Sequence, residues 1–160
     1  LNPPTPGLTH LEDEAAYRAK LAQAESESRV VCIKFYASWC RACKAMAPKY
    51  KRVADDWPEI EFCEVLFDTN KALCKGLGIK VLPYIEVVAG SAGKASTDPT
   101  PPALSHPTLS HPAGPVPQVE GFSCGPSKIS SLMEKLEVHS GCEEIPCTSV
   151  ADQLDMIERL

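Results

Sequence analysis

The chain has 160 residues, and its 16 Lys and Arg against 21 Asp and Glu give a formal net charge of −5. This length suits one domain with appendages, and the acidic balance gives no electrostatic basis for binding nucleic acid or an anionic membrane surface. No apolar run approaches the roughly 20 residues that a membrane-spanning helix needs. Two counts are high for such a chain, 15 prolines and eight cysteines.

The hydropathy pattern alternates between strand-like and helix-like stretches. In chain order it predicts a helix over 11–25, a strand over Val30–Ala37, a helix over 41–56, a strand over Ile60–Phe67, a short helix from Asn70 to Leu77, strands over Pro83–Ala89 and Val116–Phe122, and a helix over 126–137. Thr9 is expected to cap the first helix, Pro48 to interrupt and kink the second, and Asn70 to cap the third. This order predicts an α/β fold, with a sheet covered by helices on both faces.

Residues 90–118 interrupt the pattern with seven prolines and a tandem repeat, Leu104–Pro107 followed by Leu109–Pro112. Because proline removes a backbone donor and fixes φ, these residues cannot continue a helix or a central strand. We therefore expect a proline-rich insert before the last strand. The expected organisation is a flexible N-terminus over 1–8, a folded domain over 9–138, and a C-terminal tail over 139–160 that is either helical or disordered.

The sequence Trp39-Cys40-Arg41-Ala42-Cys43 lies where a predicted strand ends and a predicted helix begins. Two cysteines at this spacing can close a small disulfide ring. Cys40 would stand at the helix N-terminus, where unpaired backbone N–H groups and the helix dipole favour a thiolate. Arg41 adds a positive charge nearby, and Cys43 lies further inside, suited to resolve a mixed disulfide. A Cys-x-x-Cys at a strand-to-helix turn indicates a redox motif.

A Cys-x-x-Cys pair is also half of many zinc sites, which need two further ligands at similar spacing. The other cysteines are single, apart from the looser pair Cys142 and Cys147, and the four histidines are scattered. His106 and His111 lie in the proline-rich insert, where two histidines seldom make a preorganised metal site. The placement of the motif therefore favours redox chemistry, with no metal and no cofactor.

The stretch Phe35–Lys44, followed by Met46-Ala47-Pro48, resembles the active-site helix of the thioredoxin family. Leu82-Pro83 at the head of a predicted strand is similar to the cis-proline position of that fold, and Gly121 to a glycine in the substrate groove. The resemblance runs from about Thr9 to Val138, apart from the insert. It implies a thioredoxin fold, with a mixed central sheet flanked by helices.

The residues between the two cysteines indicate which group of thioredoxins the chain resembles. Arg41-Ala42 replaces the Gly-Pro of ordinary thioredoxins and resembles atypical plastid thioredoxins, while Cys74 and Phe122-Ser123-Cys124 are similar to the Lilium-type or Cys-His-rich group. The resemblance implies a disulfide oxidoreductase of the chloroplast stroma. Its implied partners are target proteins with disulfides or dithiols, including peroxiredoxin or another thioredoxin system. No transit peptide is visible at Leu1, which a mature or trimmed form would explain.

The resemblance also assigns roles to residues. Cys40 is the implied nucleophile that attacks a target disulfide, and Cys43 resolves the mixed disulfide. Target chains would pair with the backbone at Pro83, a form of strand addition. The implied substrate-binding surface consists of Trp39, Arg41, Ala42, Leu82, Pro83 and Gly121.

Lys34 departs from the family pattern. Thioredoxins carry a buried Asp at this position, two residues before the aromatic position of Tyr36, and it helps proton transfer at the inner cysteine. A buried lysine is costly when charged, so Lys34 is expected either to titrate or to extend to the surface. Near Cys43 its charge would stabilise a thiolate without acting as the same base. We therefore expect slower or differently poised exchange and, with Arg41-Ala42 in place of Gly-Pro, a less reducing couple.

The other cysteines have separate interpretations. Cys32 and Cys63 lie inside predicted strands and are expected to be buried core residues. Four more are candidates for regulatory thiols: Cys74, Cys124, Cys142 and Cys147. The first two of these are also candidates for a disulfide with each other, and the last two for a local disulfide or an inert pair in a reducing compartment.

Two other functions stay open. The chain is also compatible with a thioredoxin-fold protein-binding module, in which the insert and the tail recruit partners and the dithiol is secondary. A secretory disulfide isomerase domain would suit eight cysteines, but Arg41-Ala42 and the absence of a retention signal argue against it. We expect a monomer that binds neither nucleic acid nor membrane.

Overall fold

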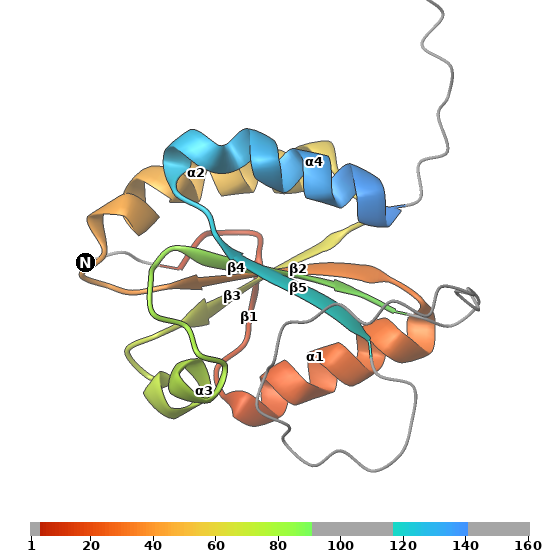
Figure 1. The fold of residues 1–160 in the computed structure, drawn as a ribbon, viewed down its shortest axis with the longest axis horizontal. Helices are drawn as coiled ribbons and strands as arrows, with labels where there is room; N and C mark the ends of the chain where they lie inside the picture. The colour runs from red at the N-terminus through yellow and green to blue at the C-terminus, as the bar shows by residue number, and fades with distance from the viewer. Residues whose placement is uncertain (1–3, 91–116, 141–160) are drawn as a thin grey trace, which may run out of the picture.

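The computed structural model describes residues 4–90 and 117–140, and within them it contains one sheet and the helices around it (Figure 1). The strands are β1 (Thr9–His10), β2 (Val30–Tyr36), β3 (Glu61–Leu66), β4 (Tyr84–Ala89) and β5 (Gln118–Ser123). The helices are α1 (Glu14–Glu27), α2 (Arg41–Asp56), α3 (Lys71–Gly76), the short 3-10 helix η1 (Pro126–Lys128) and α4 (Ile129–Ser140).

The sheet has the strand order β1-β3-β2-β4-β5. The first three of these strands are parallel, while β4 runs antiparallel to β2 and β5 antiparallel to β4. The segments that follow β1, β2, β3 and β5, and the one that precedes β4, therefore meet at one end of the sheet. We call residues 37–49, 67–83 and 124–128 the dithiol end, because both cysteines of the Cys-x-x-Cys motif lie in it.

Helices cover both faces of the sheet, as predicted. Helices α2 and α4 lie above it in Figure 1, and α1 and α3 lie below it. The core between the sheet and helices α2 and α4 includes Tyr50 and Leu132. The core between the sheet and helices α1 and α3 includes Tyr17 and Leu73. This arrangement confirms the predicted mixed sheet flanked by helices.

The first helix begins later than predicted. Asp13, not Thr9, is its N-cap, and the Oδ1 atom of Asp13 accepts a hydrogen bond from the Ala16 N–H at 2.7 Å. Thr9 and His10 instead form β1, which pairs with Cys63 and Glu64 of β3. A two-residue edge strand has no periodicity of its own, so pairing with β3 overrides the local capping signal.

The predicted interruption at Pro48 is wrong, because α2 is continuous from Arg41 to Asp56. Pro48 lies on the exposed side of the helix, where the missing backbone donor is least costly, and buried side chains such as Met46 and Tyr50 hold the opposite side against the sheet. Asn70 does precede α3, but its side chain makes no capping bond. Its amide donates instead to the carbonyl oxygen of Leu66 at 3.1 Å.

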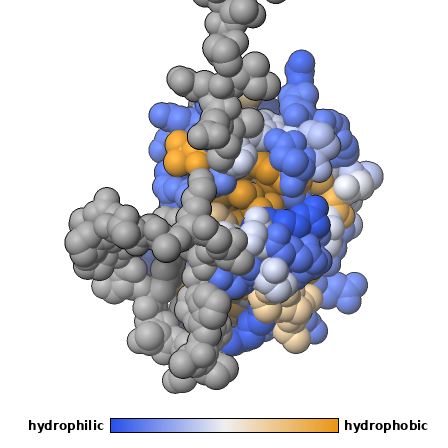
Figure 2. Space-filling model, turned by 90° about the vertical axis from the view of Figure 1, so that its right-hand side faces the viewer, coloured by the Kyte–Doolittle hydropathy of each residue, from blue (hydrophilic) through white to orange (hydrophobic). Residues whose placement is uncertain are grey.

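The predicted insert and tail fall almost entirely outside the described residues. At the C-terminal side α4 extends to Ser140, three residues beyond the predicted helix end. Figure 2 shows the face opposite the dithiol end, where hydrophilic residues cover most of the coloured surface and apolar residues gather near its centre. Across residues 4–90 and 117–140, every helix is too short or too polar to cross a membrane.

Candidate active site

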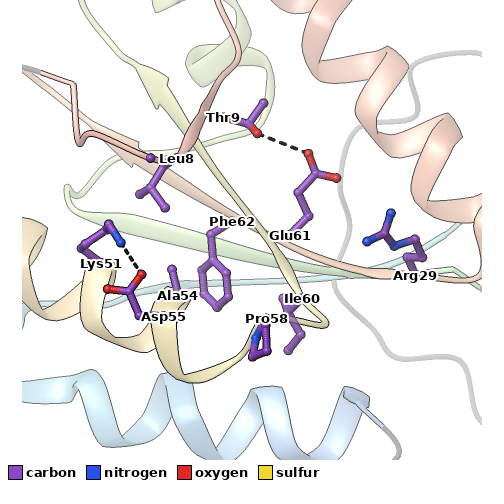
Figure 3. A pocket seen from close by; sticks show the side chains of 11 residues that line it. Leu8, Thr9, Arg29, Lys51, Ala54, Asp55, Pro58, Ile60, Glu61 and Phe62 are labelled. Carbon is purple, nitrogen blue, oxygen red and sulfur yellow. Dashed lines mark hydrogen bonds and ion pairs between the residues drawn. The ribbon is translucent and has the colours of Figure 1, made fainter.

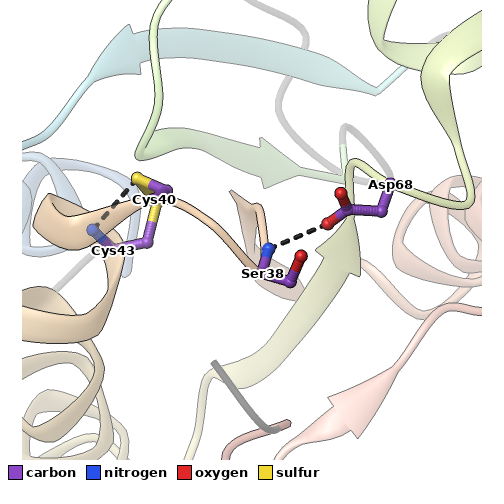
Figure 4. The surroundings of a disulfide bond; sticks show 4 residues. All are labelled: Ser38, Cys40, Cys43 and Asp68. Atoms are coloured by element: carbon purple, nitrogen blue, oxygen red, sulfur yellow. Dashed lines mark hydrogen bonds between the residues drawn. A yellow bond between two sulfur atoms is a disulfide. The ribbon is translucent and has the colours of Figure 1, made fainter. Parts of the chain in front are cut away.

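Cys40 and Cys43 are joined by a disulfide at the start of α2, with their Cα atoms 5.2 Å apart (Figure 4). Cys40 is the N-cap of the helix, and its Sγ atom accepts a hydrogen bond from the Cys43 N–H at 3.2 Å. Cys40 is 7% exposed and Cys43 2% exposed. The sulfur of Cys40 therefore lies at a helix N-terminus, where backbone N–H groups and the helix dipole favour negative charge after reduction.

The turn that carries Cys40 is fixed by a contact with the segment after β3. The Ser38 N–H donates to the Oδ2 atom of Asp68 at 2.8 Å (Figure 4), and this hydrogen bond lowers the pKa of the Asp68 carboxyl. Trp39 extends outward, 66% exposed, with its ring edge-to-face on Phe67 at 6.2 Å between centroids. The sheet thus positions the cysteines while leaving an aromatic surface beside them.

The segment before β4 completes the site. The peptide bond between Leu82 and Pro83 is cis, as predicted, and Leu82 packs against the cluster that contains Cys40 and Cys43. The carbonyl oxygen of Pro83 accepts a hydrogen bond from the Cys124 N–H at 3.0 Å. The structure therefore brings together the dithiol, Trp39 and the Leu82-Pro83 pair, which lie some 40 positions apart in the sequence.

Lys34 does not reach the surface, so that alternative is wrong. Its ammonium is 2.5 Å from Oε1 of Glu64, its neighbour on β3, and the two side chains are 2% and 1% exposed. Burial lowers the pKa of Lys34, while the charge of Glu64 opposes that effect. The Lys34 ammonium also lies 4.7 Å from the ring centroid of Tyr50 and 5.4 Å from that of Tyr36. A buried ion pair therefore lies beneath α2, the helix that carries the two cysteines of the site.

Residues 8–102 match the family model described as thioredoxin. The chain belongs to the thioredoxin family. Its curated relatives include thioredoxin-like 2, chloroplastic, of Oryza sativa subsp. japonica, 33% identical over 86% of this chain and 53% of the relative. Another is thioredoxin-like 2-2, chloroplastic, of Arabidopsis thaliana, 34% identical over 65% of this chain and 44% of the relative. The predicted resemblance to atypical plastid thioredoxins is confirmed, and the chain spans about half the length of these relatives.

Solved structures support the same fold. Thioredoxin f2 of Chlamydomonas reinhardtii is 21% identical, with a TM-score of 0.60, covering 83% of this chain and 96% of its own. Thioredoxin of Fasciola hepatica is 20% identical, with a TM-score of 0.60, covering 82% of this chain and 99% of its own. At these identities the likeness concerns the thioredoxin fold alone.

Gly121 of this thioredoxin domain packs closely against Tyr84. It lies inside β5, opposite Glu86, and a Cβ atom there would meet the Tyr84 hydroxyl oxygen at 2.1 Å. The residue of this segment that reaches Pro83 is Cys124, through the hydrogen bond described above. Gly121 therefore has a packing reason to be glycine, whereas the backbone of Cys124 lies beside the cis-proline.

The four cysteines outside the motif that the structure describes are buried free thiols: Cys32, Cys63, Cys74 and Cys124. The expectation that Cys32 and Cys63 are core residues is confirmed, since both are 0% exposed. Burial raises the pKa of Cys74 to about 11 and also raises that of Cys124. These two thiols are not paired with each other. Cys142 and Cys147 lie outside the described residues.

A pocket of about 380 Å³ lies at the other end of the sheet, where β3 begins and α2 ends (Figure 3). Its apolar lining includes Leu8, Ile60 and Phe62, and its charged side chains are engaged with partners. Lys51 pairs with Asp55, and Thr9 donates to Glu61. The pocket is separate from the dithiol. In the part of the chain that the structure describes, no group of three or more His, Cys, Asp or Glu side chains is arranged to hold a metal ion.

Sequence reasoning missed two site residues, Glu64 and Asp68. Glu64 is a charged residue in the middle of an apolar strand, which is itself a signal of a buried partner. Pairing it with Lys34 required the parallel register of β2 and β3, which one sequence does not specify. Asp68 directly follows the predicted strand, but its contact with Ser38 depends on how the two turns meet.

Proposed function

We propose that this thioredoxin domain is a thiol–disulfide oxidoreductase that exchanges disulfides with target proteins through Cys40 and Cys43. The observation that carries the proposal is the placement of Cys40 as the N-cap of α2, in a disulfide with Cys43 and beside a cis-proline. Membership of the thioredoxin family supports the same chemistry.

The proposed cycle consists of two exchange steps. In the reduced protein the Cys40 thiolate attacks one sulfur of a target disulfide, a mixed disulfide forms, and the other target sulfur leaves as a thiolate. Cys43 then loses its proton and attacks the Cys40 sulfur, which re-forms the Cys40–Cys43 disulfide and releases the second target thiolate. Two electrons pass from the dithiol to the target. The target chain pairs with the backbone beside Leu82 and Pro83, Trp39 provides an apolar rim, and Arg41 and Ala42 face the target next to Cys40.

Lys34 is proposed to tune the charge of the inner cysteine. The Lys34 ammonium faces Tyr36, and Tyr36 packs in one cluster with Cys40 and Cys43. A buried cation near a thiolate stabilises it by Coulomb attraction, which water screens little, and the Glu64 carboxylate beside Lys34 offsets part of that attraction. Lys34, held by Glu64, is proposed to bring positive charge to the position where ordinary thioredoxins carry an acid. The pH profile of disulfide reduction by Lys34→Met should shift to higher pH.

Plastid redox metabolism is the proposed setting, specifically the stroma. The relatives named above are chloroplastic, and one structural neighbour is thioredoxin f2 in complex with ferredoxin:thioredoxin reductase, 18% identical with a TM-score of 0.59. The proposed partners are a comparable electron donor and target proteins with disulfides, peroxiredoxin among them. Regulation through Cys74, Cys124, Cys142 or Cys147 is proposed as a secondary property.

Insulin-disulfide reduction tests the proposal. The dithiothreitol-dependent rate should vanish in Cys40→Ser, and Cys43→Ser should accumulate mixed disulfides with targets, which mass spectrometry then identifies. Activity that survives in Cys40→Ser would refute the assignment of the nucleophile. If the double variant Cys40→Ser/Cys43→Ser still captures the same partners, the domain is a binding module and the dithiol is secondary.

A further inference from the structure

The charge of the dithiol end has the opposite sign to that of the whole chain. The chain carries a formal net charge of −5. Residues 37–49, 67–83 and 124–128 nevertheless contain seven Lys and Arg residues against one carboxylate, Asp68. Asp68 is itself engaged by the Ser38 N–H. With Glu12, Asp13 and Glu14, which follow β1 at the same end of the sheet, the count is seven cations against four carboxylates, so positive charge still prevails around the one site where chemistry is proposed.

Three of these cations are close in sequence to residues of the site. Arg41 lies between the two cysteines, Lys44 follows Cys43 one helical turn from Arg41, and Lys80 is two residues before Leu82. All three side chains are exposed, and none forms an ion pair within the described ranges. Elsewhere in the domain six cations are paired with carboxylates: Arg18, Lys20, Arg29, Lys34, Lys51 and Lys135.

An apolar surface lies among these cations. Of the residues the structure describes, four large apolar side chains are exposed, and two of them are chain neighbours of site residues: Trp39, 66% exposed, precedes Cys40, and Val81, 59% exposed, precedes Leu82. We call Trp39, Arg41, Lys44, Lys80 and Val81 the dithiol rim. Aromatic and Arg side chains are the residues that most often dominate protein interfaces. The rim therefore combines apolar anchors with positive charges that no carboxylate of the described ranges pairs.

We propose that the dithiol rim recognises target proteins whose disulfide is flanked by Asp and Glu side chains. Complementary charge speeds diffusional encounter and disfavours basic partners. The acidic residues at this end of the sheet, Glu12, Asp13 and Glu14, follow β1, which β3 separates from β2. The acidic side of a bound target is therefore expected to lie over α2 and the segment before β4, away from β1. This inference rests on the proposed function.

The test uses two disulfide-bonded peptides of identical sequence, except that four Glu residues flanking the disulfide in one are Gln in the other. Pre-reduced protein, freed of reductant, is mixed with each peptide, and peptide thiols are measured after acid quench. At about 20 mM ionic strength we expect the acidic peptide to be reduced about tenfold faster. Near 300 mM the ratio should fall to about two, because salt screens exposed charges.

Two matched double variants test whether the dithiol rim causes the faster reduction of the acidic peptide. In Lys44→Gln/Lys80→Gln the rate ratio of acidic to neutral peptide should fall to about two at low salt. Lys51→Gln/Arg52→Gln removes the same charge at the other end of α2 and should keep the ratio near ten. An equal loss in both variants would overturn the rim assignment, and so would equal rates for the two peptides in the unmodified protein. In either case, continued reduction of the neutral peptide would leave the proposed function standing. If neither peptide is reduced, the proposed function itself fails.

Discussion

Lys34 and Glu64 form an ion pair in the interior of the sheet, with Nζ and Oε1 2.5 Å apart and both side chains at most 2% exposed. The pair spans β2 and β3 in register, and Thr5 shields it by donating from its hydroxyl to Glu64 at 2.6 Å and from its backbone N–H at 3.0 Å. A buried pair of this kind costs desolvation energy, so it is weak support for stability as a whole. Removing one partner of the pair, in contrast, is expected to destabilise the domain strongly.

Glu64→Gln should destabilise the domain strongly. It leaves the Lys34 ammonium buried without its counter-charge, and the removal of one partner from a buried pair costs about 3 to 5 kcal/mol. Urea unfolding measures the loss. Glu120→Gln is the control, because Glu120 is 41% exposed and pairs at the surface with Lys135 and His139, and exposed pairs contribute about 1 kcal/mol or less each. Equal costs for the two variants would contradict the interior placement of Lys34.

The same pair shows where sequence reasoning succeeds and where it stops. The Cys-x-x-Cys at a strand-to-helix turn and the Leu82-Pro83 pair are local patterns, so a single sequence predicts both. The partner of Lys34 depends on strand register, which is a tertiary property. The prediction that Thr9 caps the first helix is wrong for a related reason. Its capping signal is local, while the edge pairing that overrides it joins residues more than 50 positions apart.

Glu86 should make stability depend on pH. Burial raises the pKa of its carboxyl from 4.5 to about 7, and the hydrogen bond from the Tyr17 hydroxyl at 2.7 Å only partly opposes this. The folded state then binds a proton more tightly than the unfolded chain does. The contribution of Glu86 to the free energy of unfolding is complete below about pH 4.5 and is lost as pH rises through 7. A shift of this size corresponds to a contribution on the order of 3 kcal/mol.

Glu86→Gln should remove this dependence. The Gln side chain can still accept the hydrogen bond from Tyr17, so we expect little change at pH 5 and higher stability than the unmodified domain at pH 8. Tyr17→Phe should move the loss of stability to higher pH, because it removes the group that favours the ionised carboxylate. Urea unfolding at half-unit pH steps measures both. A Glu86→Gln domain with the original pH dependence would show that another group is responsible.

Thiol labelling should separate Cys40 from the buried cysteines. In the reduced, folded protein, iodoacetamide is expected to modify Cys40 first, because thiolates react and Cys40 stands at a helix N-terminus. Cys74 and Cys124 should react at least tenfold more slowly, since both are 0% exposed and burial raises the pKa of each thiol. Peptide mass mapping over time measures the order. Labelling of Cys74 or Cys124 at the rate of Cys40 would support a regulatory role for that thiol.

Gly121→Ala should destabilise the domain by about 1 to 3 kcal/mol, the range typical of overpacking. The new Cβ atom would lie 2.1 Å from the Tyr84 hydroxyl oxygen and 2.8 Å from Cζ, so the ring must move. That movement disturbs the edge-to-face contact between Tyr84 and Phe35, whose centroids are 6.1 Å apart. Gly125→Ala is the control, because nothing lies within 4 Å of its Cβ position. In a Tyr84→Ala background the cost of Gly121→Ala should largely disappear, and a cost that persists there would place its cause in the β5 backbone.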